Sequence, residues 1–281
     1  MHDSPARRPT TPARVTALSG DRVLERPDKL VTEEPMEIRV HGPGQEPESL
    51  AVTMRTPGHD FELAVGFCVS EGVLASPDDL ATVAYCLGLE PARQEYNIVT
   101  VRFRTPVDLA GRARQFVATA SCGLCGKATL DQLEVSCPPV ADGPVLTRST
   151  LYSLPERLRA EQSVFDATGG LHAAGCFGVD GSLTVLREDV GRHNAVDKVI
   201  GWAAFERRLP LSDQVLMVSG RVSFEIVQKA AVAGIPIVCA VSAPSSLAVE
   251  AAARFGQTVV GFARHDRANV YTRPDRVELG T

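Results

Sequence analysis

Two cysteines with two residues between them occur in the segment SCGLCGK, residues 121–127. Cys122 and Cys125 are each followed by a glycine, which predicts a flexible stretch. Paired thiols at this spacing serve three kinds of chemistry: a zinc site, a redox dithiol, or a carrier in which one thiolate accepts a sulfane sulfur. The neighbouring residues discriminate among them only in part.

All three kinds of chemistry stay open when the pair is compared with its surroundings. A structural zinc ion needs about four ligands, whereas the other cysteines stand alone, and Cys68 and Cys239 lie in apolar runs typical of a core. A redox pair belongs at a strand–helix junction, for which FVATA and GKATLDQLEV are candidates, but the glycines loosen such a loop. For a carrier, Lys127 and a following helix N-terminus would lower the thiol pKa.

The composition indicates a globular protein without a membrane span. The chain has 281 residues, of which 44% are apolar, and it lacks a run of about eighteen apolar residues. Its first residues, MHDSPARRPTTPAR, lack the apolar stretch of a signal peptide, so we expect a cytoplasmic protein with reduced cysteines. The net charge of −5 and the absence of a Lys/Arg-rich run argue against nucleic-acid binding.

The hydrophobic pattern divides the chain into a tail and two domains. Residues 1–14, rich in Pro, Arg and Thr, are predicted to be a disordered tail. Residues 15–118 mix strand-like runs with a helix in DFELAVGFCVSEGVL and form an α+β domain. Residues 119–281, with the CxxC loop at their start, alternate short apolar strands with helices, which predicts an α/β domain around a buried, largely parallel sheet. Asp180-Gly181 predicts the turn of a hairpin.

Polar residues follow three of the expected strands, VLMV, IVCAV and VVGF. Ligands of α/β sheets bind beyond the carboxyl ends of the strands, where helix N-termini favour anions. Ser219, Gly220 and Arg221 follow the first strand and begin a predicted helix, and Arg264 and Arg267 follow the third strand. We expect these loops to share one edge and the arginines to bind phosphate. The alternative is that the serines cap helices and the arginines are solvated.

Longer segments of the sequence carry a family resemblance. They are TPGHDFELAVGF (56–67), SCGLCG (121–126), TGGLHAAG (168–175), EDVGRHNAVDKVIG (188–201), SGRVSFEIVQKAAVAGIPIV (219–238), SAPSSLAVEAA and GFARHDRANVY. Together they resemble the FdhD family of formate dehydrogenase accessory sulfurtransferases. The resemblance covers nearly all of the chain beyond its first residues, and EDVGRHNAVDK and the cysteines between glycines are its most specific parts.

The resemblance implies a sulfur carrier. Members of the family take sulfur, as a cysteine persulfide, from a cysteine desulfurase and deliver it to the molybdenum of the bis(molybdopterin guanine dinucleotide) cofactor before the cofactor enters formate dehydrogenase. The persulfide falls on Cys122. The resemblance also implies a homodimer and a cytidine-deaminase-like C-terminal domain. The zinc pattern of the deaminases, H-x-E with P-C-x-x-C, does not occur in the sequence, so we expect no structural metal.

The family's contact with the guanine dinucleotide falls on one segment near the C-terminus. Its residues are Phe262, Ala263, Arg264, His265, Asp266 and Arg267. The residue types suit that ligand, with guanidinium groups for diphosphate, a carboxylate for a guanine N–H and an aromatic ring for stacking. We expect the loop of Ser219, Gly220 and Arg221 to complete the cofactor site.

The roles of several other residues stay open. Cys125 would release sulfide from a persulfide on Cys122 and close a disulfide, unless it is turned away or shares the sulfur. His59, His172 and His193 are candidates for a proton donor, a cofactor contact or a buried residue that orients a loop. A solvated or capping network is expected among five charged residues, Glu188, Asp189, Arg192, Asp197 and Lys198. The alternative function is a chaperone that binds the cofactor and whose thiols serve zinc binding or redox sensing.

Overall fold

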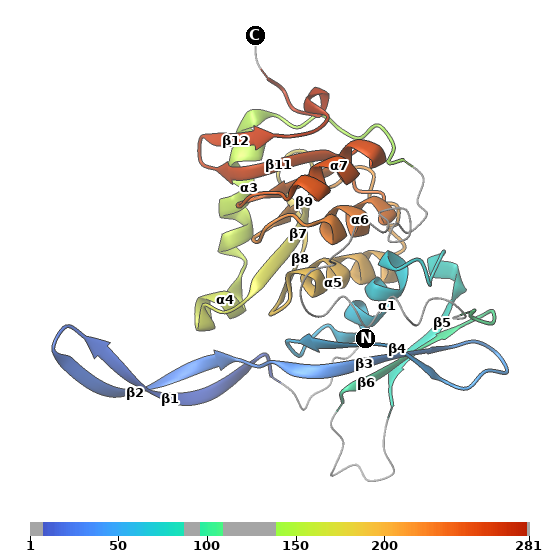
Figure 1. The fold of residues 1–281 in the computed structure, drawn as a ribbon, viewed down its shortest axis with the longest axis horizontal. Coiled ribbons are helices and arrows are strands. Elements are labelled where there is room, and N and C mark those ends of the chain that lie inside the picture. The colour runs from blue at the N-terminus through green and yellow to red at the C-terminus, as the bar shows by residue number, and fades with distance from the viewer. Residues whose placement is uncertain (1–7, 87–95, 109–138, 280–281) are drawn as a thin grey trace.

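The structure, a computed structural model, describes residues 8–86, 96–108 and 139–279 (Figure 1). These residues form three sheets. Several sequence predictions lie outside the described residues: Cys122, Cys125, the strand and helix expected on either side of them, and the domain boundary expected between residues 118 and 119.

A long hairpin comes first in the chain. Strand β1 (Thr10–Ser19) pairs antiparallel with β2 (Arg22–Val31), and this arm extends away from the rest of the molecule (Figure 1). The prediction of a disordered tail is therefore wrong for residues 10–14, which pair with residues 27–31. The proline-rich composition suggested disorder, but a two-stranded ribbon has free outer edges, at which a proline such as Pro12 is tolerated.

A four-stranded sheet follows, with a helix on one face. Its strands are β3 (Glu34–His41), β4 (Glu48–Arg55), β5 (Leu80–Tyr85) and β6 (Ile98–Phe103), in the order β4-β3-β6-β5. Helix α1 (Asp60–Ser70) confirms the helix predicted here, and a 3-10 turn (Pro77–Asp79) leads into β5. Met36, Ile38 and Val40 are buried because alternate side chains of β3 face the core.

The C-terminal part of the chain forms a six-stranded mixed sheet. Its strands are β7 (His172–Phe177), β8 (Leu183–Asp189), β9 (Val215–Val218), β10 (Ile237–Ala240), β11 (Thr258–Arg264) and β12 (Arg267–Val270), in the order β12-β11-β10-β9-β7-β8. The predicted α/β class is confirmed, as is the hairpin at Asp180-Gly181, which joins β7 to β8.

The expectation of a largely parallel sheet holds only for its centre. Strands β9, β10 and β11 run parallel to one another, whereas β7, β8 and β12 pair antiparallel. The outer strands differ because short hairpins, rather than crossover helices, join β7 to β8 and β11 to β12.

Helices cover both faces of the six-stranded sheet (Figure 1). Helix α3 (Arg148–Ala160), followed by the short α4 (Ser163–Thr168), buries Leu151, Leu154 and Leu158 against one face. On the other face lie α5 (Arg192–Phe205), α6 (Phe224–Val232) and α7 (Ser246–Phe255). One hydrophobic core runs from this second layer through α1 to the four-stranded sheet, so α1 and α5 lie between the two sheets.

Two glycines allow α1 and α5 to cross at close range. A Cβ atom on Gly66 would overlap the carbonyl oxygen of Asp197, and a Cβ atom on Gly201 would overlap the carbonyl oxygen of Glu62. Any larger residue at either position would therefore force the two helices apart, and with them the two sheets.

Alanine is predicted to destabilise the protein at position 66, although alanine is ordinarily the better helix former. In an uncrowded helix the change from glycine raises the free energy of unfolding by about 1 kcal/mol. The overlap with the Asp197 carbonyl instead lowers it by roughly 1–3 kcal/mol, which urea unfolding measures. Gly220→Ala is the control, since Gly220 has no positive φ and a Cβ atom there would make only ordinary contacts of 3.4 Å or more. A Gly66→Ala variant more stable than wild type would contradict the close crossing.

Candidate functional site

Three loops meet at one edge of the six-stranded sheet. The loop after β9 contacts the loop after β10, where the Val222 N–H donates to the Ala243 carbonyl (3.2 Å) and the Ser245 N–H donates to the Val222 carbonyl (3.0 Å). The loop after β10 contacts β11 through the Phe262 N–H and the Ser242 carbonyl (3.2 Å). The expected common edge is confirmed, because three parallel strands end there.

The loop Ser219–Arg221 is tied to strand β7 rather than to a helix. The Ser219 hydroxyl accepts a hydrogen bond from the Ala173 N–H (2.9 Å), and the Ser219 N–H donates to the Ala173 carbonyl (2.9 Å). The predicted helix starts later, at Phe224 with Ser223 as its N-cap, so Ser219 does not cap it. Pairing with β7 holds the chain extended beyond β9, which delays the helix.

The segment predicted to contact a nucleotide forms the β11–β12 hairpin. Arg264 pairs with Arg267 across its tip, after an irregularity in the pairing between Gly261 and Arg264. Phe262, in this irregular stretch, has a positive φ of 53° and is 37% exposed. Ala263 is fully buried, so its side chain belongs to the core and only its backbone can meet a ligand.

The charges of this hairpin are mostly unpaired. Within the described residues, neither Arg264 nor Arg267 has an ion-pair partner, and Asp266 is exposed beside them. His265 is engaged elsewhere, since its Nδ1 lies 2.8 Å from Oε1 of Glu156 on α3. The tip of the hairpin therefore presents two guanidinium groups and one carboxylate to solvent.

Two of the candidate histidines lie near the same edge. His172 begins β7 and is partly buried. The Nε2 atom of His193 lies 3.0 Å from the Ser223 hydroxyl and 3.5 Å from the Glu225 carboxylate, and this hydrogen bonding lowers the pKa of Glu225 to about 2. His193 is thus engaged with the start of α6, which fits a residue that orients a loop.

The EDVGRHNAVDK segment forms a buried ion pair at its centre, not a solvated network. The Lys198 ammonium lies 2.7 Å from the Asp189 carboxylate, and both side chains are at most 1% exposed. The ammonium also donates to the carbonyls of Thr56 (3.0 Å) and Glu188 (3.2 Å). The Asp189 carboxylate accepts a hydrogen bond from the Thr56 N–H (3.1 Å). The segment between β4 and α1 is therefore locked to the end of β8.

The other charges of this segment also differ from the prediction. Asp197 pairs with Lys229 of α6 (3.0 Å) and not with Arg192. Although burial alone would lower the pKa of Lys229, the carboxylates of Asp197 and Glu71 raise it above its usual value. Glu188 confirms the capping part of the expectation, because its carboxylate accepts the first N–H groups of α4. The network was misjudged because the partner of Asp197 lies on another helix.

Comparison with known proteins places the chain in a family. The model of the FdhD/NarQ family matches residues 31–278. The chain belongs to this family. Proteins named sulfur carrier protein FdhD include one from Mycolicibacterium paratuberculosis, 49% identical over 276 residues, which are 95% of this chain and 98% of that protein. Another, from Streptomyces coelicolor, is 52% identical over 278 residues, 97% of each chain.

A solved structure shows that the family's fold is shared at low sequence identity. It is described as that of a formate dehydrogenase accessory protein from Desulfotalea psychrophila. The TM-score is 0.72 at 23% identity, over 96% of this chain and 100% of the other.

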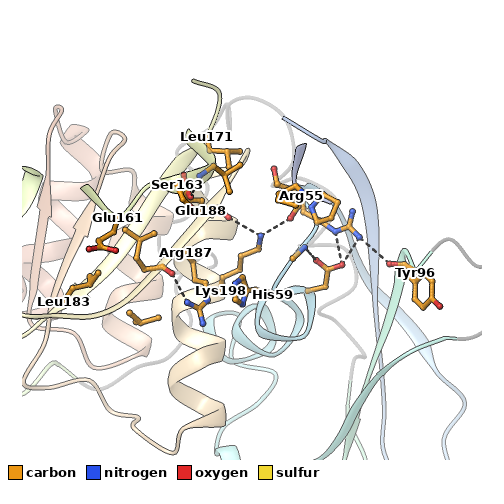
Figure 2. A pocket seen from close by; sticks show the side chains of 18 of the residues that line it. Arg55, His59, Tyr96, Glu161, Ser163, Leu171, Leu183, Arg187, Glu188 and Lys198 are labelled. Atoms are coloured by element: carbon orange, nitrogen blue, oxygen red, sulfur yellow. Dashed lines mark hydrogen bonds and ion pairs between the residues drawn. The ribbon is translucent and has the colours of Figure 1, made fainter. Parts of the chain in front are cut away.

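This member of the FdhD/NarQ family has a cavity that sequence reasoning missed. Its volume is about 600 Å³, and it lies between the start of α1, strand β8 and α4. Figure 2 shows Glu188 and Arg55 facing it from opposite sides. Most of its charges are paired, as between Arg55 and Asp60 (2.7 Å). His59, the third candidate histidine, lines the cavity and lies 3.2 Å from the Glu62 carboxylate.

The cavity was missed because its walls come from segments far apart in the sequence. One local signal in the sequence was the Pro57-Gly58 dipeptide, which marks a turn. In the structure, Gly58 and His59 both have positive φ angles, 112° and 58°. Non-glycine residues adopt this conformation rarely, and such strain gathers at functional sites. The motif PGHD thus pointed to an unusual backbone, but not to the strand that lies opposite it.

Three of the four cysteines that the structure describes cannot compete with the CxxC pair as nucleophiles. Cys68, Cys176 and Cys239 are fully buried, which confirms the core positions predicted for the first and last of them. Burial raises the pKa of both Cys176 and Cys239 to about 12, so these thiols stay protonated. Cys86 is exposed.

The described part of the chain holds neither a cluster of metal-ligating side chains nor a membrane-spanning helix. Residues 8–86, 96–108 and 139–279 contain no group of three His, Cys, Asp or Glu side chains placed to hold a metal ion. The same residues include no helix long and apolar enough to span a membrane.

Lys198→Met is predicted to lower the free energy of unfolding by about 3–5 kcal/mol, because the Asp189 carboxylate would stay buried without its counter-ion. The double variant Lys198→Met/Asp189→Asn should recover part of the loss, since it leaves no buried charge. Urea unfolding measures both. Lys29→Met, on the exposed arm, is the matched control. Equal midpoints for Lys198→Met and Lys29→Met would show that the ion pair contributes little.

Proposed function

We propose that this chain carries sulfur as a persulfide on Cys122 and delivers it to the molybdenum of a bis(molybdopterin guanine dinucleotide) cofactor, before the cofactor enters formate dehydrogenase. The observation that carries the proposal is the likeness, at 49% and 52% identity over nearly the whole chain, to proteins named sulfur carriers. The second part of the proposal, binding of the cofactor, is supported by a cationic edge in the described part of the chain.

Loading of sulfur is an exchange between two cysteines. The Cys122 thiolate attacks the terminal sulfur of a persulfide on a cysteine desulfurase. The S–S bond of the donor breaks, its cysteine leaves as a thiolate, and the new S–S bond forms on Cys122, so no external oxidant or reductant is needed. The three buried thiols cannot substitute, because they stay protonated and out of reach of a protein donor.

The hairpin tip supports a cofactor site at the sheet edge. The unpaired guanidinium groups of Arg264 and Arg267 suit a diphosphate, which they would bind through charge-assisted hydrogen bonds. The exposed Phe262 ring suits stacking on a base, and Asp266 suits a guanine N–H. The loop of Ser219–Arg221 lies one strand away from this hairpin and would extend the site.

We further propose a cytoplasmic homodimer that works between a cysteine desulfurase as donor and formate dehydrogenase as client. The resemblance to the family supports these partners. The net charge of −5 is consistent with protein partners and does not favour nucleic acid.

Persulfide loading is predicted to depend on Cys122. After incubation with a cysteine desulfurase and cysteine, intact mass should rise by about 32 Da, and reductant should remove the added sulfur. Cys122→Ala should abolish the adduct, whereas Cys125→Ala should do less harm. The exposed Cys86 offers a matched control, since Cys86→Ala should load like wild type. An unmodified wild-type protein would contradict the carrier and leave the chaperone with a zinc or redox CxxC as the better account.

Guanosine diphosphate is predicted to bind far more tightly than adenosine diphosphate, because adenine lacks the N1–H and 2-amino donors of guanine that would pair with the Asp266 carboxylate. Arg264→Gln or Arg267→Gln should weaken its binding about tenfold or more, the scale of one lost charge-assisted hydrogen bond. Isothermal titration calorimetry measures both effects. Arg14→Gln removes the same charge from the exposed arm and should change nothing. Unchanged binding in the hairpin variants would place the nucleotide elsewhere.

A further inference from the structure

The arm formed by β1 and β2 leaves large apolar side chains in solvent. Leu18, Val23, Leu24 and Leu30 are each more than half exposed. Leu18 and Val23 lie directly opposite each other across the hairpin, so their side chains share one face near its tip. A two-stranded ribbon is at best marginally stable in water by itself. We therefore expect another surface to cover the arm.

The free edge of β4 is a second uncovered surface. Strand β4 is an outer strand of the four-stranded sheet, and no strand in the described part of the chain pairs with its free side. Near the end of β4 this side is occupied, since the Met54 carbonyl accepts a hydrogen bond from the Asn194 amide (2.8 Å). Residues 48–52 have no such partner among the described residues, and Val52 is more than half exposed. Exposed edges of this kind favour the addition of a further strand.

A groove lies beside this edge. It has a volume of about 230 Å³ and lies between β4 and the helices α1, α5 and α6. Its walls combine apolar side chains, among them Ala51, Phe67 and Val190, with the carboxylates of Glu71 and Glu225. A ribbon added along residues 48–52 would extend the sheet and would cover the groove with one of its faces.

One face of the arm has the matching chemistry. Arg22, Leu24 and Arg26 are alternate residues of β2, so their side chains share a face, and Leu24 lies opposite Ala17 there. This face combines apolar and cationic side chains, as a groove with apolar and carboxylate walls requires. At the start of β4, Glu48 offers a further carboxylate. Neither Arg22 nor Glu48 has an ion-pair partner among the described residues.

The direction of the arm brings it to this edge in a symmetric pair. Only Thr32 and Glu33 separate β2 from β3, and Figure 1 shows the arm continuing the line of β3. A two-fold axis beside Thr32 reverses that line, so the arm of one copy would lie along the four-stranded sheet of the other. The arm strands have ten residues and β3 and β4 have eight, or about 34 and 27 Å, so the tip would reach the start of β4.

We propose that the arm of one copy of this chain adds to the free edge of β4 in a second copy, with its tip against residues 48–52. The inference rests on the proposed homodimer and names the surfaces that form it. Each arm covers the edge of the other copy, so the contact is made twice and no edge is left for a third copy. One face of the ribbon covers roughly 300 Å², and the two contacts bury roughly 1,200 Å² counted on both copies, at the lower end of the range for stable dimers.

Sedimentation equilibrium of the full chain tests the contact, and wild type should be a dimer. Arg22→Glu should weaken the dimer about tenfold, since an exposed ion pair is lost twice, and Arg22→Glu/Glu48→Arg should restore it. Leu18→Ser/Val23→Ser should weaken it at least about a hundredfold, because two apolar side chains are lost from each contact. Val179→Ser is the matched control: it removes an exposed apolar side chain from the β7–β8 hairpin and should dimerise like wild type.

Amide hydrogen exchange of wild type gives a readout that needs no variant. Exchange in the arm and in residues 48–52 should slow as the protein concentration rises through the dissociation constant, because added backbone hydrogen bonds protect both segments. Exchange in the β7–β8 hairpin should not change. Exchange in residues 48–52 that is independent of concentration would contradict the added strand.

The outcomes separate this inference from the proposed function. A dimer that neither Arg22→Glu nor Leu18→Ser/Val23→Ser weakens would overturn the arm contact and leave the homodimer with another interface. A wild-type chain that stays monomeric would overturn both the arm contact and the homodimer, while the mass of Cys122 persulfide would still test the sulfur carrier alone. Loss of the dimer in Arg22→Glu that Glu48→Arg does not restore would overturn the placement of the tip at the start of β4.

Discussion

The buried ion pair between Asp189 and Lys198 sets the geometry on which the rest of the structure depends. It ties the end of β8 to α5, and through both backbone groups of Thr56 it holds the segment between β4 and α1. Burying two charges is stable only when their remaining hydrogen-bonding capacity is satisfied. The backbone groups around the pair satisfy that need, so the position of the four-stranded sheet relative to the six-stranded sheet is fixed.

The ion pairs formed around this contact determine which charged side chains remain without a partner. Where α1 and α5 cross, Asp197 pairs with Lys229 and Glu62 pairs with Arg187, while Asp189 pairs with Lys198. The arginines at the sheet edge are left without carboxylate partners among the described residues. A chain with a net charge of −5 thereby presents a cationic edge, and the local arrangement, not the net charge, decides which ligand it attracts.

Local patterns in the sequence predicted the helices and strands, but they could not predict contacts between segments far apart in the sequence. The apolar periodicity predicted helix α1, the strand–helix alternation predicted the α/β layer, and the strand ends predicted the shared edge. The partner of Asp197 and the cavity opposite PGHD depend on segments that only the fold brings together. The prediction of a disordered tail was wrong for a different reason. The composition of the arm is typical of a disordered segment, although its strands pair in a regular register. Cys122 and Cys125 lie outside the described residues, so their roles stay predictions.

We propose that the cationic sheet edge, and not the cavity between α1 and β8, receives the guanine nucleotide end of the cofactor. A crystal structure of the full chain with guanosine diphosphate tests it most directly. We predict diphosphate density against Arg264 and Arg267, with the base near Phe262 and Asp266. Nucleotide density in the cavity, beside Arg55 and His59, would contradict the account.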